Sequence, residues 1–239
     1  MPDGRNCGVR QCKQKFFGFD MTLRLYSNYL NSAGERVRIA LAMKRIGYEY
    51  ISVGQIGWEA YEKINPQRLM PTLLVEDQII PQSTAILEYL EETFPEPRLL
   101  PANAITRAQA RGFAQHITSE MHAIDVIRVR RFLENQLRVD QEGIARWQHH
   151  WFATGFTALE EILARRSRPF AYCYSDTPGW AELHLVPQVR KGLSRFNLNL
   201  AAYPLIADVY KNCIDLPAFI ASAPQSQPDY PGTVIEPKI

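Results

Sequence analysis

The sequence predicts a small mixed α/β domain followed by an all-helical domain. Strand-like and helix-like segments alternate in the order βαβαββα over about eighty residues. A proline-rich linker follows at 95–101, and nearly every segment beyond it has helical periodicity. We therefore expect an N-terminal arm at 1–20, an α/β domain at 21–95 and a helical domain at 105–228.

Apolar spacing and turn residues define the elements of the first domain. Strands are expected at 22–27, 48–53, 72–76 and 78–80, and helices at 37–46, 61–64 and 83–93. Gly47 predicts the end of the first helix, because glycine readily adopts the left-handed conformation that closes a helix. The last helix ends before Pro95, since helical geometry is disfavoured in the residue that precedes a proline.

Three helical patterns and a tail make up the second domain. One long helix is expected at 106–137, and another at 180–192 with Asp176 or Thr177 as its cap. Between them, residues that recur at three- or four-residue steps predict a core-facing stripe: Ile144, Trp147, Trp151, Gly155, Leu159 and Ile162. The tail after Ala223 is rich in Pro and Gln, which predicts poor packing.

Charge and hydropathy argue against two classes of partner. The chain has 27 basic and 25 acidic residues; the arm holds four of the basic and two of the acidic ones, so the remainder carries 23 of each. Nucleic-acid binding needs a clustered basic face, which this balance does not favour. No apolar run approaches the ~18 residues of a membrane span. We expect neither a nucleic-acid nor a membrane partner.

The cysteines indicate a reducing compartment and a cytoplasmic protein. Cys7, Cys12, Cys173 and Cys213 are too few and too scattered for a disulfide framework. Cys7 and Cys12 have no further Cys or His close by, so no metal site is expected. The arm lacks the apolar segment of a secretory signal. It can be a leader, a disordered arm or an upstream start, and we favour a dispensable, disordered arm.

The stretch around Met70-Pro71 predicts an edge that can bind an extended peptide. Pro71 precedes the apolar strand at 72–76, and a proline belongs at a strand start or an edge because it cannot donate to a sheet ladder. A cis Pro71 would leave the backbone N–H and C=O of Met70 free to pair with a ligand.

A carboxylate pocket is predicted at the start of the next helix. Ser83 stands where an N-cap belongs, and its hydroxyl and the free backbone donors of the first turn can hold a carboxylate. The alternative is that Ser83 only caps the helix. Together with the Met70 edge, the pocket describes a site for a small peptide.

The sequence from about 23 to 228 resembles the zeta class of glutathione transferases, which includes maleylacetoacetate and maleylpyruvate isomerases. The resemblance rests on the order and spacing of several stretches: Arg36-Val37-Arg38-Ile39-Ala40-Leu41, Asn65-Pro66, Met70-Pro71, Gln82-Ser83, Ile86-Leu87-Glu88-Tyr89-Leu90-Glu91-Glu92, Gly155-Phe156-Thr157-Ala158-Leu159-Glu160, Leu185-Val186-Pro187-Gln188-Val189 and Tyr203-Pro204. It implies a thioredoxin-like N-terminal domain, an all-helical C-terminal domain and a homodimer.

The resemblance also implies a glutathione site. Met70 would pair its backbone with the cysteinyl unit of glutathione beside a cis Pro71, while Gln82 and Ser83 would bind the γ-glutamyl carboxylate. These positions match the residues of the family.

The segment expected to activate the thiol departs from the family. A Ser-Ser-Cys run is typical of the zeta class, whereas this chain has Asn31, Ser32 and Ala33. Catalysis needs a donor that lowers the pKa of a thiol, about 8.5 when free. The Ser32 hydroxyl, the Asn31 amide or backbone N–H groups can supply it, and we favour Ser32, then Asn31. The alternative is that Ser32 only caps the helix.

A second departure concerns the helix at 180–192. The family commonly begins it with a Ser/Thr-x-x-Asp capping box, where this chain has Gly179 and Glu182. Because glycine offers no side-chain cap, Asp176 or Thr177 is expected to replace it.

Arginines are expected to hold the substrate, because arginine binds carboxylates bidentately. By resemblance, Arg195 matches a substrate-binding arginine and His122 a histidine of some bacterial members. Arg128 and Arg131 lie three residues apart on the long helix that lines the family's cleft, so they share a face. The alternative for these arginines is a solvated or ion-paired surface position.

The resemblance implies a glutathione-dependent cis–trans isomerase that acts on a carboxylated conjugated enone such as maleylacetoacetate. Glutathione would serve as the coenzyme and be regenerated in each turnover. One alternative is a transferase that conjugates glutathione to an electrophile. The other is a non-catalytic glutathione-binding protein that lost its activity with the Ser-Ser-Cys run.

Overall fold

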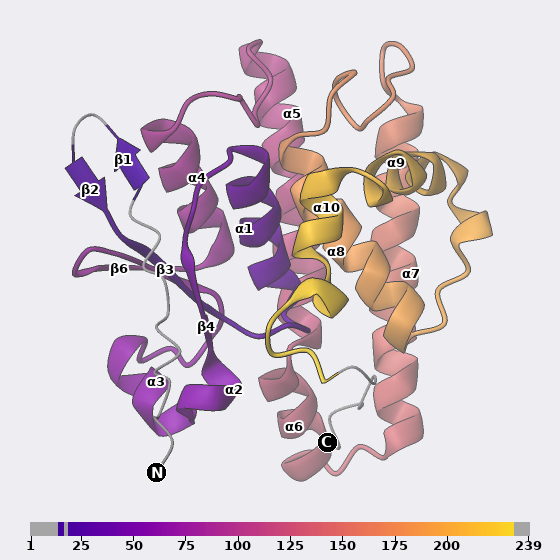
Figure 1. Ribbon diagram of the computed structural model, residues 1–239. Coiled ribbons are helices and arrows are strands. Elements are labelled where there is room, and N and C mark those ends of the chain that lie inside the picture. The colour runs from indigo at the N-terminus through magenta and orange to yellow at the C-terminus, as the bar shows by residue number, and fades with distance from the viewer. Residues whose placement is uncertain (1–13, 17–18, 232–239) are drawn as a thin grey trace.

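A computed structural model describes residues 14–16 and 19–231 of the chain (Figure 1). A four-stranded sheet with its helices stands beside a larger group of helices, as the sequence predicts. Helix α1 (Ser32–Met43) lies between the sheet and the helical domain, where it packs against α8 (Trp180–Arg195) and α10 (Pro217–Ser222). The two domains therefore share one continuous core.

The sheet has the strand order β4-β3-β5-β6. Its strands are β3 (Leu23–Ser27), β4 (Glu49–Ser52), β5 (Thr72–Val75) and β6 (Gln78–Pro81). Strand β4 runs parallel to β3, while β5 is antiparallel to both β3 and β6. The other helices of this domain are α2 (Val53–Ile56), α3 (Trp58–Ile64) and α4 (Ser83–Thr93). The predicted order of elements is confirmed, with one additional short helix, α2, between β4 and α3.

The predicted end of the first helix is wrong. Helix α1 ends at Met43, and Arg45, with φ of 55°, takes the left-handed position that we assigned to Gly47. The N–H of Ile46 then donates to the carbonyl of Leu41 at 2.8 Å, and the Ile46 side chain is buried. Burial of this apolar residue closes the helix earlier than the glycine would.

The expectation of a disordered arm falls mostly on residues 1–13 and 17–18, which lie outside the described residues. Within the arm and at its end, β1 (Gln14–Phe16) and β2 (Phe19–Met21) pair as antiparallel strands.

The long helix expected at 106–137 is not continuous. It divides into α5 (Ala104–Gln115), the wider π-helical turn η1 (His116–His122), η2 (Ala123–Asp125) and α6 (Ile127–Asn135). Val126 is extended, with ψ of 153°, which separates η2 from α6. Wide turns of this kind interrupt helices at functional sites. Here the break changes which side chains of 116–135 face inward.

Helix α8, whose apolar residues are almost all buried, packs against α1, α5, η1 and α9 (Pro204–Ile214). The remaining helices are α7 (Gln141–Ala164), η3 (Leu200–Ala202), α10 and η4 (Pro224–Ser226). The core face of α7 holds Ile144, Gly155 and Leu159 as predicted, whereas Ile162 of the predicted stripe is exposed. No helix in the described part of the chain is long and apolar enough to cross a membrane.

The predicted cap of α8 is wrong as well. Gly179 is the N-cap, and the Glu182 carboxylate accepts from the N–H of Gly179 and of Cys173, both at 2.7 Å. Asp176 instead accepts from Arg168 and from the Ala171 N–H. One half of a capping box is therefore kept, and Glu182 also fastens the preceding loop.

Gly179 is required by a close approach of the linker. The N–H of Trp180 donates to the carbonyl of Leu99 at 2.7 Å, and a Cβ on Gly179 would stand 2.5 Å from that same oxygen. We expect Gly179→Ala to lower the free energy of unfolding by about 1–3 kcal/mol, because backbone has to shift to relieve the overlap. Urea unfolding of Gly179→Ala and of Gly112→Ala checks this. Gly112 lies on α5 with nothing within 4 Å of a Cβ, so its variant should be as stable as wild type or slightly more so.

The described part of the C-terminal tail, up to residue 231, packs against the end of α10, contrary to the expectation from its composition. Ala223 and Gln227 are buried, and Gln227 Nε2 donates to the carbonyls of Ala221 and Ala223 at 3.0 and 2.9 Å. The polar residues that suggested disorder thus bond to the end of α10.

Candidate functional site

The start of α1 shows which of Asn31 and Ser32 caps the helix, and hence which of them is left to activate a thiol. Asn31 is the N-cap, and its side-chain oxygen accepts from the N–H of Gly34. Ser32 is the first residue of the helix, so the alternative that Ser32 is the cap is wrong. With its amide engaged in capping, Asn31 is the weaker candidate for thiol activation.

Ser32 lies beside His122, which comes from the far end of η1. Ser32 Oγ stands 3.4 Å from His122 Nδ1, and Ser32 is 7% exposed. Burial, together with the charges of Arg36 and Lys191, holds the pKa of His122 well below its usual range. The imidazole is therefore neutral near pH 7 and can donate at one ring nitrogen and accept at the other.

Met70 lies just outside β5 with a cis peptide bond to Pro71, as the resemblance implied. Among the hydrogen bonds of the described residues, none uses the Met70 backbone N–H or C=O. The adjoining backbone is held by two side chains, since Tyr61 Oη and Asn65 Nδ2 both donate to the carbonyl of Leu69, at 2.7 and 2.9 Å. The backbone N–H and C=O of Met70 are therefore available to a ligand, next to backbone that the Leu69 hydrogen bonds hold in place.

The start of α4 is open to an anion. Gln82, and not Ser83, is the N-cap, and it makes no side-chain cap bond. Its φ of 71° is uncommon for a residue other than glycine and occurs at functional sites. The first backbone N–H groups of α4 therefore lack a side-chain cap and can hold a carboxylate. Gln82 Nε2 donates to Gln67 Oε1 at 2.8 Å, which orients the exposed amide.

Arg36 supplies a buried positive charge next to Ser83. Its Nη1 donates to Ser83 Oγ at 3.3 Å, so the Ser83 hydroxyl proton is available to a ligand. The other two guanidinium nitrogens, Nε and Nη2, have no hydrogen-bond partner in the described part of the chain. Burial lowers the pKa of Arg36 to about 9, which leaves it charged at neutral pH. A buried cation with unused donors fits an anionic ligand.

Together these features fit glutathione. The Met70 edge can pair with a peptide unit, and the α4 start with Ser83 can hold a carboxylate. Ser32 follows on the α1 side, one helical turn before Arg36.

A cluster of charged side chains lies on the helical-domain side of His122. Asp125 is 1% exposed and accepts from Gln148 Nε2 at 2.7 Å. Lys191 Nζ stands 2.6 Å from Asp125 Oδ2, and Arg130 Nε stands 3.8 Å from Oδ1. Burial lowers the pKa of Lys191. The negative charge of Asp125 opposes this shift, whereas the positive charges of Arg195 and Arg130 add to it.

The cluster has more positive than negative charge. Asp125 contributes one negative charge, whereas Lys191 and Arg130 contribute two positive ones. Lys191 is also near enough to His122 to affect its pKa. A carboxylated substrate would balance the excess charge.

The structure brings only some of the predicted arginines into this region. Arg195 lies within electrostatic range of Lys191 and is half-buried. Arg128 and Arg131 share the exposed side of α6, whereas Arg130 between them turns inward to Asp125. Arg130 is therefore the buried arginine of α6, and a cleft-lining role for Arg128 and Arg131 stays a prediction.

Several residues of the site escaped the sequence analysis: Arg36, Arg130, Asp125, Lys191 and Gln148. Only Arg36 had a signal in the sequence, since it stands one turn after Ser32 in the stretch that carries the resemblance. The others come from four separate elements, η2, α6, α7 and α8, and meet only after folding.

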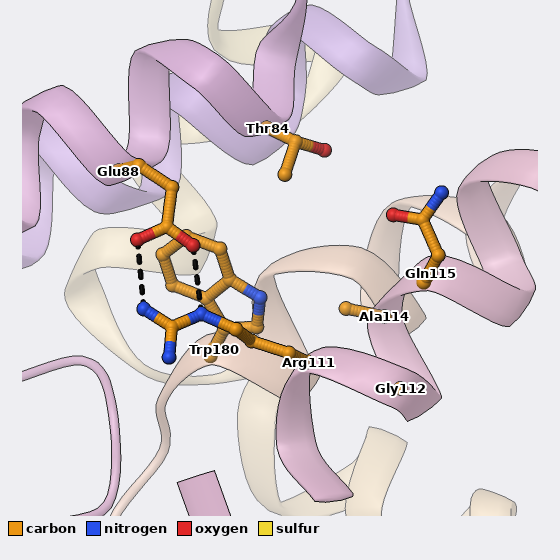
Figure 2. Close-up of a pocket in the computed structure, with 7 residues that line it drawn as sticks. All are labelled: Thr84, Glu88, Arg111, Gly112, Ala114, Gln115 and Trp180. Atoms are coloured by element: carbon orange, nitrogen blue, oxygen red, sulfur yellow. Dashed lines mark hydrogen bonds and ion pairs between the residues drawn. The ribbon is translucent and has the colours of Figure 1, made fainter. Parts of the chain in front are cut away.

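A separate cavity of about 290 Å³ lies between α4, α5 and α8 (Figure 2). Glu88 and Arg111 form a bidentate ion pair across it, at 2.8 Å for each bond, and the Arg111 guanidinium stands over the Trp180 ring. None of the predicted site residues lines this cavity, so it is distinct from the candidate site. Within the described residues, no group of three or more His, Cys, Asp or Glu side chains could hold a metal ion.

Comparison with known proteins identifies the family. Residues 25–98 match the model of the glutathione S-transferase N-terminal domain. The chain is 38% identical over 212 residues to maleylpyruvate isomerase of Ralstonia, covering 87% of this chain and 99% of that protein. It is 37% identical over 215 residues to a probable maleylacetoacetate isomerase of Vibrio cholerae, with coverage of 87% and 99%.

Solved structures agree with these matches. The holo structure of maleylpyruvate isomerase, a bacterial zeta-class glutathione S-transferase, superposes with a TM-score of 0.82 at 38% identity, covering 86% of this chain and 99% of that one. Maleylacetoacetate isomerase of Anaeromyxobacter dehalogenans with glutathione in its active site gives a TM-score of 0.79 at 36% identity, with coverage of 88% and 99%. This chain therefore belongs to the zeta class of glutathione S-transferases, the family of the maleylacetoacetate and maleylpyruvate isomerases.

Proposed function

We propose that this enzyme is a glutathione-dependent cis–trans isomerase of a carboxylated conjugated enone, of the type of maleylpyruvate or maleylacetoacetate. The observation that carries the proposal is the position of Ser32 and His122 between a peptide-and-carboxylate site and a cluster with excess positive charge. The chain's similarity to maleylpyruvate isomerase of Ralstonia supports the same activity.

Four groups of this chain would hold glutathione. The Met70 backbone pairs with the cysteinyl unit, while Gln82, Ser83 and the first N–H groups of α4 bind the γ-glutamyl carboxylate. The charge of Arg36 strengthens the hold on that carboxylate. When bound, glutathione supplies a thiolate nucleophile for reversible addition to the conjugated double bond.

Ser32 is the proposed thiol-activating residue. With His122 protonated at Nδ1, the imidazole donates to Ser32 Oγ and leaves the Ser32 proton free to donate to the thiolate. The nearby charges of Arg36 and Lys191 also favour a negative group at this place. Together they replace the Ser-Ser-Cys run that is typical of the class.

Lys191, Arg130 and Arg195 are proposed to bind the substrate carboxylate and to hold negative charge that develops on its carbonyl oxygen. Asp125 pairs with both Lys191 and Arg130, which compensates part of the cost of holding two positive charges in the protein interior.

One assay separates this function from its two alternatives. The enzyme is incubated with glutathione and maleylpyruvate, and both the product geometry and the free thiol are followed. An isomerase converts the cis acid to the trans acid with no loss of thiol. Loss of thiol would identify a conjugating transferase, and retention of glutathione on a column with neither change would identify a binding protein.

Arg195→Ala is expected to raise the KM for the carboxylated substrate about 10- to 100-fold, because a charge-assisted hydrogen bond is lost. Glutathione affinity should stay the same, since Met70 and Ser83 are untouched. Initial-rate kinetics and a glutathione binding titration measure the two quantities. Arg146→Ala, which removes an exposed arginine paired with Glu142 on α7, is the control. An unaltered KM for Arg195→Ala would make Arg195 structural.

The proposal includes a cytoplasmic homodimer. The family resemblance supports the dimer, and the two described cysteines, Cys173 and Cys213, are buried free thiols in keeping with a reducing compartment. Light scattering coupled to size exclusion tests the dimer by its mass, against 27.4 kDa for one chain.

A further inference from the structure

The last described residues of the chain reach back to the turn that precedes Ser32. This turn, residues 28–31, connects β3 to α1. The Asp229 carboxylate accepts from the backbone N–H of Tyr29 at 3.2 Å, although the two residues are 200 positions apart. The rings of Tyr230 and Tyr29 meet edge to face, with centroids 5.5 Å apart. The tail and the turn therefore form one packed unit.

The same carboxylate is also held by β4. Tyr50 Oη donates to Asp229 Oδ1 at 2.9 Å, and Ser52 Oγ donates to Oδ2 at 2.8 Å. Hydrogen bonds to an ionised acceptor are about twice as strong as neutral ones. Because three donors converge on one carboxylate, Asp229 fixes the turn against the end of the neighbouring strand.

Arg38, on α1, binds the backbone carbonyls of the turn. Its Nη1 donates to the carbonyl of Asn28 and its Nη2 to that of Tyr29, both at 3.4 Å, while Nε donates to the carbonyl of Ser222 at 3.1 Å. Arg38 is 1% exposed. The carbonyls of the turn thus face a buried cation, and the Tyr29 N–H faces an anion.

We propose that Asp229 is a positioning residue for thiol activation: it fixes the β3–α1 turn so that Ser32 keeps its hydroxyl at His122 and at the bound thiol. The inference rests on the proposed function. The Ser32–His122 distance of 3.4 Å is near the limit of a hydrogen bond, so a small displacement of the turn breaks it. Displacements of about 1 Å can cost two orders of magnitude in rate.

The test is Asp229→Asn in the full chain, with the pKa of enzyme-bound glutathione measured from the ultraviolet absorbance of the thiolate. Removal of a negative charge by itself would lower the pKa of a nearby thiol. If Asp229 acts through position, the pKa rises instead, by about one unit for a tenfold loss of stabilisation, and kcat falls by about the same factor. Glutathione affinity stays within about twofold, because the Met70 and Ser83 groups are not part of the turn.

Ser52→Ala and Tyr50→Phe keep the charge of Asp229 and each remove one of its three donors. Both should shift the thiol pKa upward by a smaller amount, and they carry the test if Asp229→Asn does not fold. A lowered or unchanged thiol pKa in all three variants would overturn the inference. Wild-type enzyme that lowers the thiol pKa but isomerises nothing would contradict the proposed function and leave this inference standing.

Discussion

Replacing Ser32 by alanine is expected to lower kcat about 100-fold. The reason is that the variant lacks a preorganised hydrogen-bond donor to the negatively charged sulfur. Removal of one such donor typically costs about two to three orders of magnitude in rate. The pKa of bound glutathione should rise toward that of a free thiol, about 8.5. Steady-state kinetics and ultraviolet titration of the bound thiol measure both effects.

Because Ser32 does not cap α1, its effect on catalysis can be separated from an effect on stability. Asn31 caps α1 and Ser32 does not, so Ser32→Ala should keep the wild-type stability, whereas Asn31→Ala should lose about 1 kcal/mol. Ser167→Ala, at an exposed position after α7, controls for the loss of a hydroxyl elsewhere. If Ser32→Ala changes neither the thiol pKa nor turnover, the activating donor is the Asn31 amide or a backbone N–H.

Acid is expected to destabilise the protein through His184, which is fully buried on α8. Burial and the charge of Arg36 lower the pKa of His184 to about 3, while its Nδ1 bonds the carbonyl of Trp180 at 2.8 Å. The unfolded chain binds this proton at about pH 6.5, so the stabilisation is complete above pH 6.5 and is lost progressively as the pH falls from that value toward about 3. From pH 7 to pH 5 this one group lowers the free energy of unfolding by about 2 kcal/mol.

His184→Asn isolates this contribution. Asparagine keeps a donor for the Trp180 carbonyl but does not titrate, so the drop in unfolding free energy between pH 7 and pH 5 should shrink by about 2 kcal/mol. Urea unfolding at both pH values measures the drop. His149→Asn, at an exposed position on α7, should keep the wild-type drop. An equal drop in His184→Asn and wild type would contradict a neutral buried His184.

Local signals in the sequence were sufficient for the architecture. The strands and α4 were predicted closely because apolar periodicity, Pro71 and Pro95 act on neighbouring residues. The errors arose where a distant contact overrides local preference. Ile46 closes α1 before Gly47, and Glu182 reaches back to Gly179 in place of Asp176.

The helical domain shows the same limit in the site itself. Arg128 and Arg131 share one face of α6, as expected, but that face is exposed, and it is Arg130 that turns inward to Asp125 after the break formed by η1 and the extended Val126. Sequence periodicity cannot reveal such a break, because the side chains that favour it belong to other helices, as where Met121 packs on Gly155.

The sequence alone determined the fold class, and it predicted a peptide-binding edge at Met70-Pro71 and a carboxylate pocket at Ser83, since both depend on short-range geometry at a strand start and a helix start. The tertiary structure decided the contacts around Ser32 and His122: which arginine faces inward, that Asp125 pairs with Lys191, and that Asp229 binds the turn before Ser32. Charged residues far apart in the chain have no local preference for one another. They pair where packing removes them from water, because an unpaired buried charge is costly.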